Sequence, residues 1–253
     1  MKTAKRLLSY GAIALIWLAI WWIAALIVNA PIILPSPVEV ISKLSELISE
    51  TEFWLSILYS LIRVLFGLLC ATVIALLTAA VSFKFSLIER FLKPLVTVIK
   101  STPIVSFVFV AYIVFSKDLN ALPAFIAGLI VFPVMHESTL DALKRTPKEL
   151  VEVSEVFGAT FIERLRYLWI PTALPPFISS SKTSIGLAWK SGVAAEALIA
   201  IPSILSIGNE IYNARLEIEA AYQFAWTLVI IILSLGIELI FSFAAKKLTE
   251  KIL

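Results

Sequence analysis

The chain has 253 residues, of which 60% are hydrophobic and 15% are charged, and its mean hydropathy is +0.98. A soluble domain is about half apolar and about a quarter charged, so this composition excludes an ordinary soluble protein and indicates a protein that crosses a membrane several times. The net charge of +3 does not predict nucleic-acid binding, because the basic residues are sorted between two sets of segments.

Six apolar segments approach the length of about 20 residues that a helix needs to cross a bilayer. They lie at about 10–28, 55–82, 95–115, 119–136, 177–201 and 222–245. Segments three and four contain Pro103, Pro123 and Pro133, which a helix bundle tolerates when neighbouring groups satisfy the freed carbonyls. The sequence therefore predicts an all-α, polytopic membrane protein with six transmembrane helices in a single domain, residues 1–253.

The charges between these segments predict the orientation of the chain. Alternate segments, beginning with the N-terminal one, carry most of the basic residues: Lys2, Lys5, Arg6, Lys84, Arg90, Lys93, Lys144, Arg145, Lys148, Arg164, Arg166, Lys246, Lys247 and Lys251. The other segments carry mainly acids, namely Glu39, Glu46, Glu50, Glu52, Asp118, Glu210, Glu217 and Glu219, beside Lys43, Lys117 and Arg215. The positive-inside rule then predicts that both termini are cytoplasmic.

A short helix is expected between the first two spans. Ser36 and Glu39 form a capping-box pattern, with Pro37 at the first helical position. An apolar stripe at helical spacing follows: Val40, Ile41, Leu44, Leu47 and Ile48. These residues predict an amphipathic helix on the outer surface, which either packs over the mouth of the bundle or contacts a protein that delivers substrate.

The segment at about 137–176, between spans four and five, is the longest polar stretch. Thr146 to Glu149 reads as a second capping box with Pro147 at the first helical position, and Gly158 is placed to end that helix. Thr160 to Glu163 reads as a third capping box, and Pro171 is placed to end the helix that follows it. The predicted loop is a helix, a tight glycine bend and a second helix.

This predicted loop displays aromatic and arginine side chains: Phe157, Phe161, Arg164, Arg166 and Tyr167. Side chains of these types anchor many protein interfaces. They predict a docking surface for a partner, unless they pack against the underside of the bundle.

The same loop resembles the EAA loop of bacterial ATP-binding-cassette importer permeases. Glu152-Val153-Ser154 is followed by Gly158 and then by Leu168-Trp169-Ile170-Pro171, and the spacing from Gly158 to Pro171 fits. Val153 and Ser154 depart from the two alanines of that pattern. The resemblance implies that the loop couples to an ATPase through Glu152, Phe157, Gly158, Phe161, Arg164, Arg166 and Pro171.

Further motifs resemble the nitrate, sulfonate and taurine branch of these permeases over about residues 34–245. They are Leu34-Pro35-Ser36-Pro37, Leu174-Pro175, Gly186-Leu187-Ala188-Trp189 and, further along, Glu196. The resemblance implies a multi-pass subunit of a bacterial or archaeal plasma membrane, surrounded by lipid. It also implies three kinds of partner: a second copy of the chain, two cytoplasmic ATPase subunits and an extracytoplasmic substrate-binding protein.

Charges within the apolar segments predict where a substrate passes. A charge at the middle of a span costs about 2.5–3.5 kcal/mol on insertion scales, so such residues normally face a cavity or a partner. Arg63 and Lys190, with Trp189 and Glu196, are the predicted path residues. An excess of buried positive charge favours a small anion such as a sulfonate or nitrate. Ion pairing of these cations with Glu196 or Glu238 explains the pattern equally well, and a neutral vitamin or vitamin precursor stays an alternative substrate.

The sequence lacks the motifs that ATP hydrolysis, metal binding or intramembrane catalysis would need. No G-x-x-x-x-G-K-[ST] phosphate loop occurs, so no catalytic residue is predicted, and ATP with its Mg²⁺ is expected on a partner subunit. Cys70 and His136 are the only residues of their types and predict no metal site. A stand-alone secondary transporter would show two related halves and an intramembrane enzyme a nucleophile with its base. Neither pattern is present.

Overall fold

The computed structural model describes residues 2–200 and 204–252, and every regular element in those ranges is helical. The elements are α1 (Lys2–Val28), α2 (Pro37–Ile48), α3 (Thr51–Lys84), α4 (Ser86–Ser101), α5 (Ile104–Val114), α6 (Ala121–Lys144), α7 (Lys148–Val156), α8 (Phe161–Arg164), a π-helical turn (Leu165–Trp169), α9 (Ile170–Ile199), α10 (Ile207–Leu216) and α11 (Ala220–Ile252). The predicted all-α class is confirmed. Residue 201, the last of the predicted fifth span, lies outside the described ranges.

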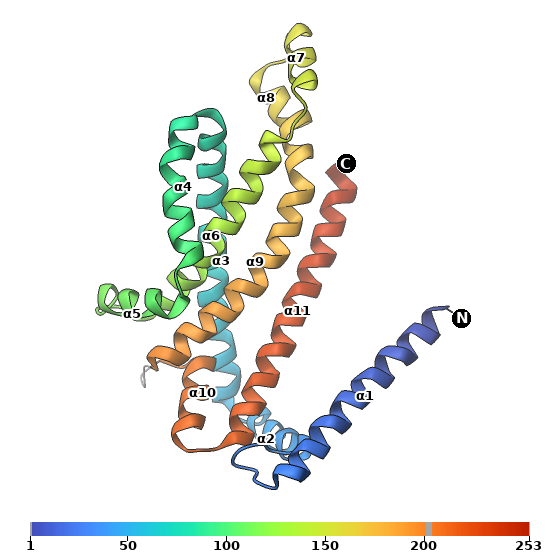
Figure 1. Ribbon diagram of the computed structural model, residues 1–253, viewed down its shortest axis with the longest axis vertical. Coiled ribbons are helices and arrows are strands. Elements are labelled where there is room, and N and C mark those ends of the chain that lie inside the picture. Colours follow the sequence, from blue (N-terminus) through green and yellow to red (C-terminus); the bar gives the residue numbers. More distant parts are fainter. Residues whose placement is uncertain (1, 201–203, 253) are drawn as a thin grey trace.

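The molecule is elongated, and its two ends differ (Figure 1). Helices α7 and α8 project beyond the other helices at one end, whereas α2 and α10 lie at the opposite end. Helix α1 leans away from the bundle. The long helices α3, α9 and α11 run between the two ends, and α6 runs from the level of α5 toward α7.

Helices α3, α6 and α9 pack closely on one another and form the centre of the bundle. The approach depends on glycine. A Cβ atom at Gly67 of α3 would lie 2.0 Å from the carbonyl oxygen of Ala124 in α6, and one at Gly192 of α9 would lie 2.4 Å from Cγ2 of Val64. Small residues at such points let helix backbones come into contact, which is how helices associate within a membrane.

Within the described residues, α1, α3, α6 and α11 are long and apolar enough to cross a membrane, and α4 with α5 makes a fifth candidate if the bent pair is one span. Helix α9, predicted as the fifth span, is less apolar and is not among these candidates. It carries Lys182, Lys190 and Glu196 and several serines. Because α9 packs against α3, α6, α10 and α11, part of its surface faces protein rather than lipid.

The span predicted at 95–115 is not one continuous helix. The chain breaks between α4 and α5, whose axes are bent by 107°. Pro103 lacks an N–H to continue the helix, and Thr102 before it takes the extended backbone (φ −87°, ψ 132°) that a residue preceding proline prefers. Packing within the bundle does not keep the helix continuous through Pro103.

Two predictions for the polar loop also need correction. Thr146 does not cap α7: the helix begins at Lys148 after Pro147, and the buried Thr146 Oγ1 has no hydrogen-bond partner among the described atoms. Pro171 does not end the following helix either, because a π-helical turn at Leu165–Trp169 leads directly into α9. The wider turn accommodates the missing proline N–H. Helix α6 continues to Lys144, within the segment predicted as the loop.

The predicted surface helix between the first two spans is confirmed as α2. The Ser36 side chain accepts a hydrogen bond from the N–H of Glu39, and the Glu39 carboxylate accepts one from the N–H of Ser36, so the capping box is complete. Val40 and Leu47 are buried and the helix packs on α11. Ile41 and Ile48, at the edge of the stripe, stay exposed.

Candidate functional site

The first candidate site is the tip of the molecule, residues 147–169, which includes α7, the bend and α8. Gly158 lies two residues after the end of α7 and has φ +71°, a conformation that glycine adopts without the steric cost of a Cβ. The N–H of Gly158 donates to the carbonyl of Glu155 at 2.9 Å, and the N–H of Ala159 donates to that of Ser154 at 2.9 Å. The bend therefore satisfies the last carbonyls of α7.

The start of α8 is fixed by local hydrogen bonds. The Glu163 carboxylate accepts from the N–H of Thr160 at 2.7 Å and from its hydroxyl at 2.8 Å, while Thr160 Oγ1 accepts from the N–H of Glu163 at 3.3 Å. The backbone donor, followed by the hydroxyl, lowers the pKa of Glu163 below its ordinary value. The predicted capping box at Thr160 is confirmed.

The tip presents exposed apolar side chains beside charged ones. Phe157 is 84% exposed, and other side chains of the tip are also exposed: Leu150, Val153, Val156, Phe161, Ile162 and Tyr167. Exposed apolar groups that lie together mark interaction surfaces. Glu152 and Arg166 are exposed beside them, and Arg164 Nη1 donates to Glu155 Oε1 at 2.6 Å, which braces the two helices.

The tip is tied to the bundle through Trp169. The Trp169 ring packs against Phe161 of α8, with ring centroids 5.4 Å apart, and against Phe83 of α3, with centroids 5.7 Å apart. The half-buried Pro171 follows in α9. A displacement of α8 therefore acts on both α3 and α9.

The second candidate site is a polar cluster inside the bundle, where α3 meets α9. Arg63 Nη1 lies 3.1 Å from Glu196 Oε1, and the two side chains are 13% and 2% exposed. The other Glu196 oxygen accepts from Ser60 Oγ at 2.7 Å and from the N–H of Gly208 at 3.3 Å. An ion pair with Glu196 was one of the two interpretations of Arg63 that the sequence allowed. The pair is present, and it joins residues 133 positions apart.

The same cluster reaches α6 and α10. Arg63 Nη1 also donates to the carbonyl of Leu205 at 3.1 Å, and Nη2 donates to Asn120 Oδ1 at 3.2 Å. Ser60 Oγ accepts from the N–H of Ile207 at 2.9 Å. Gly208 is required here, because a Cβ would lie 2.3 Å from that of Glu196. The Arg63 guanidinium therefore donates twice from Nη1 and once from Nη2 to groups of this chain.

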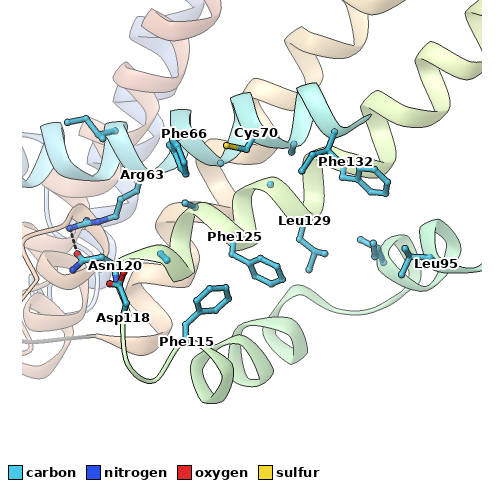
Figure 2. Close-up of a pocket in the computed structure, with 18 residues that line it drawn as sticks. Arg63, Phe66, Cys70, Leu95, Phe115, Asp118, Asn120, Phe125, Leu129 and Phe132 are labelled. Carbon is cyan, nitrogen blue, oxygen red and sulfur yellow. Dashed lines mark hydrogen bonds between the residues drawn. The ribbon is translucent and has the colours of Figure 1, made fainter. Parts of the chain in front are cut away.

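A cavity of about 740 Å³ borders this cluster and extends along α3 and α6 (Figure 2). Arg63, Asp118 and Asn120 lie at one end of the lining, and Leu95 and Phe132 lie at the other (Figure 2). Gly67, Ala71, Ala124 and Gly128, at the close contact of the two helices, also line it. The volume falls within the range of about 300–1,000 Å³ that is common for small-molecule sites.

The four predicted path residues are not all brought together. Arg63 and Glu196 lie in the cluster. Trp189 is 1% exposed in the core and donates its indole N–H to the carbonyl of Ile230 in α11 at 3.1 Å. Lys190 is exposed on another face of α9, and no described ion pair joins it to Glu238.

Three residues of this region were missed by the sequence argument: Ser60, Asp118 and Asn120. A serine within an apolar helix and polar residues in a connecting segment are common, so the sequence alone did not distinguish them. Helix α10, which closes the cluster, was missed too, although Ser206 accepts from the N–H of Asn209 as a helix cap. That pattern was the available signal.

Curated relatives of the chain are transport permeases. It is 26% identical over 188 residues to the formylaminopyrimidine transport permease protein ThiX of Halalkalibacterium halodurans, covering 74% of each chain. It is 24% identical to the taurine transport system permease protein TauC of Escherichia coli, covering 76% of this chain and 72% of TauC. It is 26% identical to the nitrate import permease protein NrtB of Synechococcus elongatus, covering 83% and 78%.

Solved structures share the fold at low identity. A chain of the MetNI methionine ABC transporter in an inward-facing conformation matches with a TM-score of 0.58 and 16% identity, over 79% of this chain and 94% of that one. A chain of a bacterial ABC transporter that imports the acidic polysaccharide alginate matches with a TM-score of 0.61 and 17% identity, over 98% of both chains.

Residues 71–252 match the family described as binding-protein-dependent transport system inner membrane component. This match spans more than half of the chain and includes the tip, α9 and Glu196. The relatives include taurine and nitrate permeases, as the motifs in the sequence indicated. The chain is therefore a multi-pass inner-membrane protein, a transport permease rather than an enzyme, and it belongs to the binding-protein-dependent transport system inner membrane component family.

Proposed function

We propose that two copies of this chain form the substrate path of an ATP-binding-cassette importer, that the tip docks on separate ATPase subunits, and that an extracytoplasmic binding protein delivers the substrate. The observation that carries the proposal is the exposed apolar tip built on the bend at Gly158. Nucleotide and Mg²⁺ belong to the ATPase subunits in this scheme, and this chain needs no cofactor of its own.

The proposed orientation places the tip in the cytoplasm. Lys84, Arg90 and Lys93 lie near the turn between α3 and α4, at the same end as α7 and α8 (Figure 1). The acidic residues of α2 and α10 lie at the other end. This sorting agrees with the positive-inside rule for six spans with α9 as the fifth and with both termini cytoplasmic.

The proposed coupling is a rigid-body movement. A force on Phe157 and Phe161 passes through Trp169 to α3 and α9, and both helices continue to the Arg63–Glu196 pair. From Ile170 to Glu196 the α9 axis spans about 40 Å at 1.5 Å per residue. Because a helix transmits displacement without changing its length, closure of the ATPases can move the cluster and the cavity relative to the partner copy.

The substrate is proposed to be a small solute, and the relatives named above are described as permeases for formylaminopyrimidine, taurine and nitrate. Two intramembrane cations favoured an anion on sequence grounds. The charge of Arg63 is balanced by Glu196 at 3.1 Å, so Lys190 alone supports that reasoning. Lys190 therefore still supports an anionic substrate, whereas the largely apolar lining of the cavity supports a neutral vitamin precursor.

Co-purification tests the docking role of the tip. Affinity-tagged wild-type chain is expected to retain a soluble ATPase, and Phe157→Asp is expected to lose most of it while inserting normally, because Phe157 contacts solvent rather than the core. Leu216→Asp is the matched control, since Leu216 is also exposed but lies in α10 at the opposite end. No ATPase with the wild-type chain, or equal loss in both variants, would contradict the proposal.

A further inference from the structure

We propose that the cavity along α3 and α6 accepts an uncharged nitrogen heterocycle that donates hydrogen bonds, in preference to an oxyanion. The inference rests on the proposed transport function and names the substrate class. It depends on three properties of the cavity: its charge balance, the hydrogen-bonding groups at its polar end, and its aromatic walls.

The charge balance of the cavity does not favour an anion. Of the described lining residues, Arg63 and Asp118 are the ones of the charged types Arg, Lys, Asp and Glu. Arg63 is already paired with Glu196, so an entering oxyanion would meet a guanidinium whose charge is already balanced and the unbalanced carboxylate of Asp118. It would also lose its hydration in a largely apolar space, which is costly without new partners. Like-charge contact of this kind selects against a ligand.

The polar end can recognise an amino-substituted ring. The Asn120 amide oxygen accepts from Arg63, so its NH₂ group remains the donor that the side chain can present. The Asp118 carboxylate, which has about four acceptor positions, uses one for the N–H of Asn120 at 3.2 Å. One donor beside one acceptor matches a ring nitrogen beside an amino group, and no formal charge is needed on the ligand.

The walls suit a planar ring rather than a flexible chain. Phe66 of α3, Phe115 after α5 and Phe125 of α6 line the cavity around its polar end (Figure 2). The rings of Phe115 and Phe125 lie with centroids 5.1 Å apart and an interplanar angle of 48°. Aromatic rings add about 0.5–1.5 kcal/mol to a stacked or edge-to-face contact beyond the area they bury. The close contact at Gly67 and Ala124 forms the floor between these walls.

Cys70 gives a direct test, because it is the sole cysteine of the chain, is exposed and lines the cavity. The rate of its alkylation by a small maleimide would be measured in the purified, ATPase-bound transporter with cytosine, nitrate, methanesulfonate or choline added. Cytosine is expected to slow the reaction about tenfold at about ten times its dissociation constant, by mass action. Nitrate, methanesulfonate and choline are expected to leave the rate unchanged.

Variants test whether the protection of Cys70 by cytosine depends on residues that line the cavity. Phe66→Ala and Asp118→Asn should each abolish protection by cytosine. Phe91→Ala, an exposed phenylalanine of α4 outside the lining, and Asp141→Asn of α6 should retain it. Protection that survives in Phe66→Ala and Asp118→Asn would overturn the inference.

Other results identify a different occupant and also overturn the inference. Stronger protection by nitrate or methanesulfonate would make the cavity an anion site, and protection by choline alone a cation site. A rate that responds only to the acyl chains of the surrounding lipid would assign the groove to lipid. A cysteine that reacts only after the two copies separate would assign it to the second copy. Each of these can occur while the ATPase stays bound, so the inference can fail with the proposed function intact; loss of the ATPase from the wild-type chain would instead reject that function.

Discussion

The tip and the Arg63–Glu196 cluster are built in opposite ways. The tip depends on contacts between residues close in the sequence, such as Thr160 with Glu163 and Arg164 with Glu155, and it leaves apolar side chains exposed. The cluster joins α3, α6, α9 and α10 through residues far apart in the sequence, and it buries its charges. A surface that binds a partner can be specified locally, whereas a polar site inside a bundle exists only when several helices are in place.

The largest effect is expected from Glu196→Ala. It leaves the Arg63 guanidinium without its counter-charge inside the bundle, and removing one member of a buried ion pair costs about 3–5 kcal/mol. Thermal unfolding of the chain in detergent should show the loss. Glu238→Ala is the control, because Glu238 is half-buried in α11 without a described ion pair, and it should cost much less.

The double change Arg63→Ala with Glu196→Ala sharpens this test. If the pair is structural, the double variant should recover part of the stability lost in Glu196→Ala, because no charge is left unpaired. A double variant that is as unstable as the sum of the two single ones would show that the pair itself is not what the cluster contributes.

The next effect is expected from Gly158→Val. A β-branched residue at φ +71° carries about 1–3 kcal/mol of backbone strain, although a Cβ there meets no atom within 4 Å. The bend should therefore change without a steric clash, and ATPase stimulation and uptake should fall while membrane insertion stays normal. Gly158→Asn is the matched variant, since asparagine tolerates this conformation better. Normal coupled transport in Gly158→Val would remove the bend from the mechanism.

A smaller effect is expected from Thr160→Ala. Loss of a helix-capping side chain costs about 1 kcal/mol, and here it should appear as faster hydrogen exchange at the start of α8. Thr146→Ala is the control within the same loop, because Thr146 looks alike in sequence yet makes no cap. Equal effects of the two changes would mean that the cap at Thr160 does not hold the tip.

The smallest effect on stability is expected from Lys190→Ala, at about 0.5 kcal/mol or less, because an exposed side chain with no described ion pair contributes little. Its proposed role in the path predicts a larger loss of uptake. Protein yield and uptake by the reconstituted importer separate the two. A variant with normal yield and normal uptake would exclude Lys190 from the path.

Much of the tip, and the start of α2, could be predicted from the sequence. The caps at Ser36 and Thr160 and the glycine bend were identified because each depends on residues within about one helical turn. The errors have equally local causes. Pro103 breaks a segment that was predicted as one span because it is apolar throughout. Pro171 lies inside a helix, because a π-helical turn accommodates it. Thr146 fits the capping pattern, but the helix starts one residue later than that pattern requires.

The sequence by itself determined that the chain is helical, lies in a membrane and carries a capped polar loop, and it indicated the permease family through the spacing around Gly158. These features follow from apolar runs and from interactions between neighbouring residues. Only the tertiary structure decided that Arg63 pairs with Glu196, that Trp189 is buried, and that Asp118 and Asn120 border a cavity with Phe66 and Phe125. Those relations depend on how α3, α6, α9 and α10 pack, and residues that meet across a bundle leave no periodic pattern in the chain.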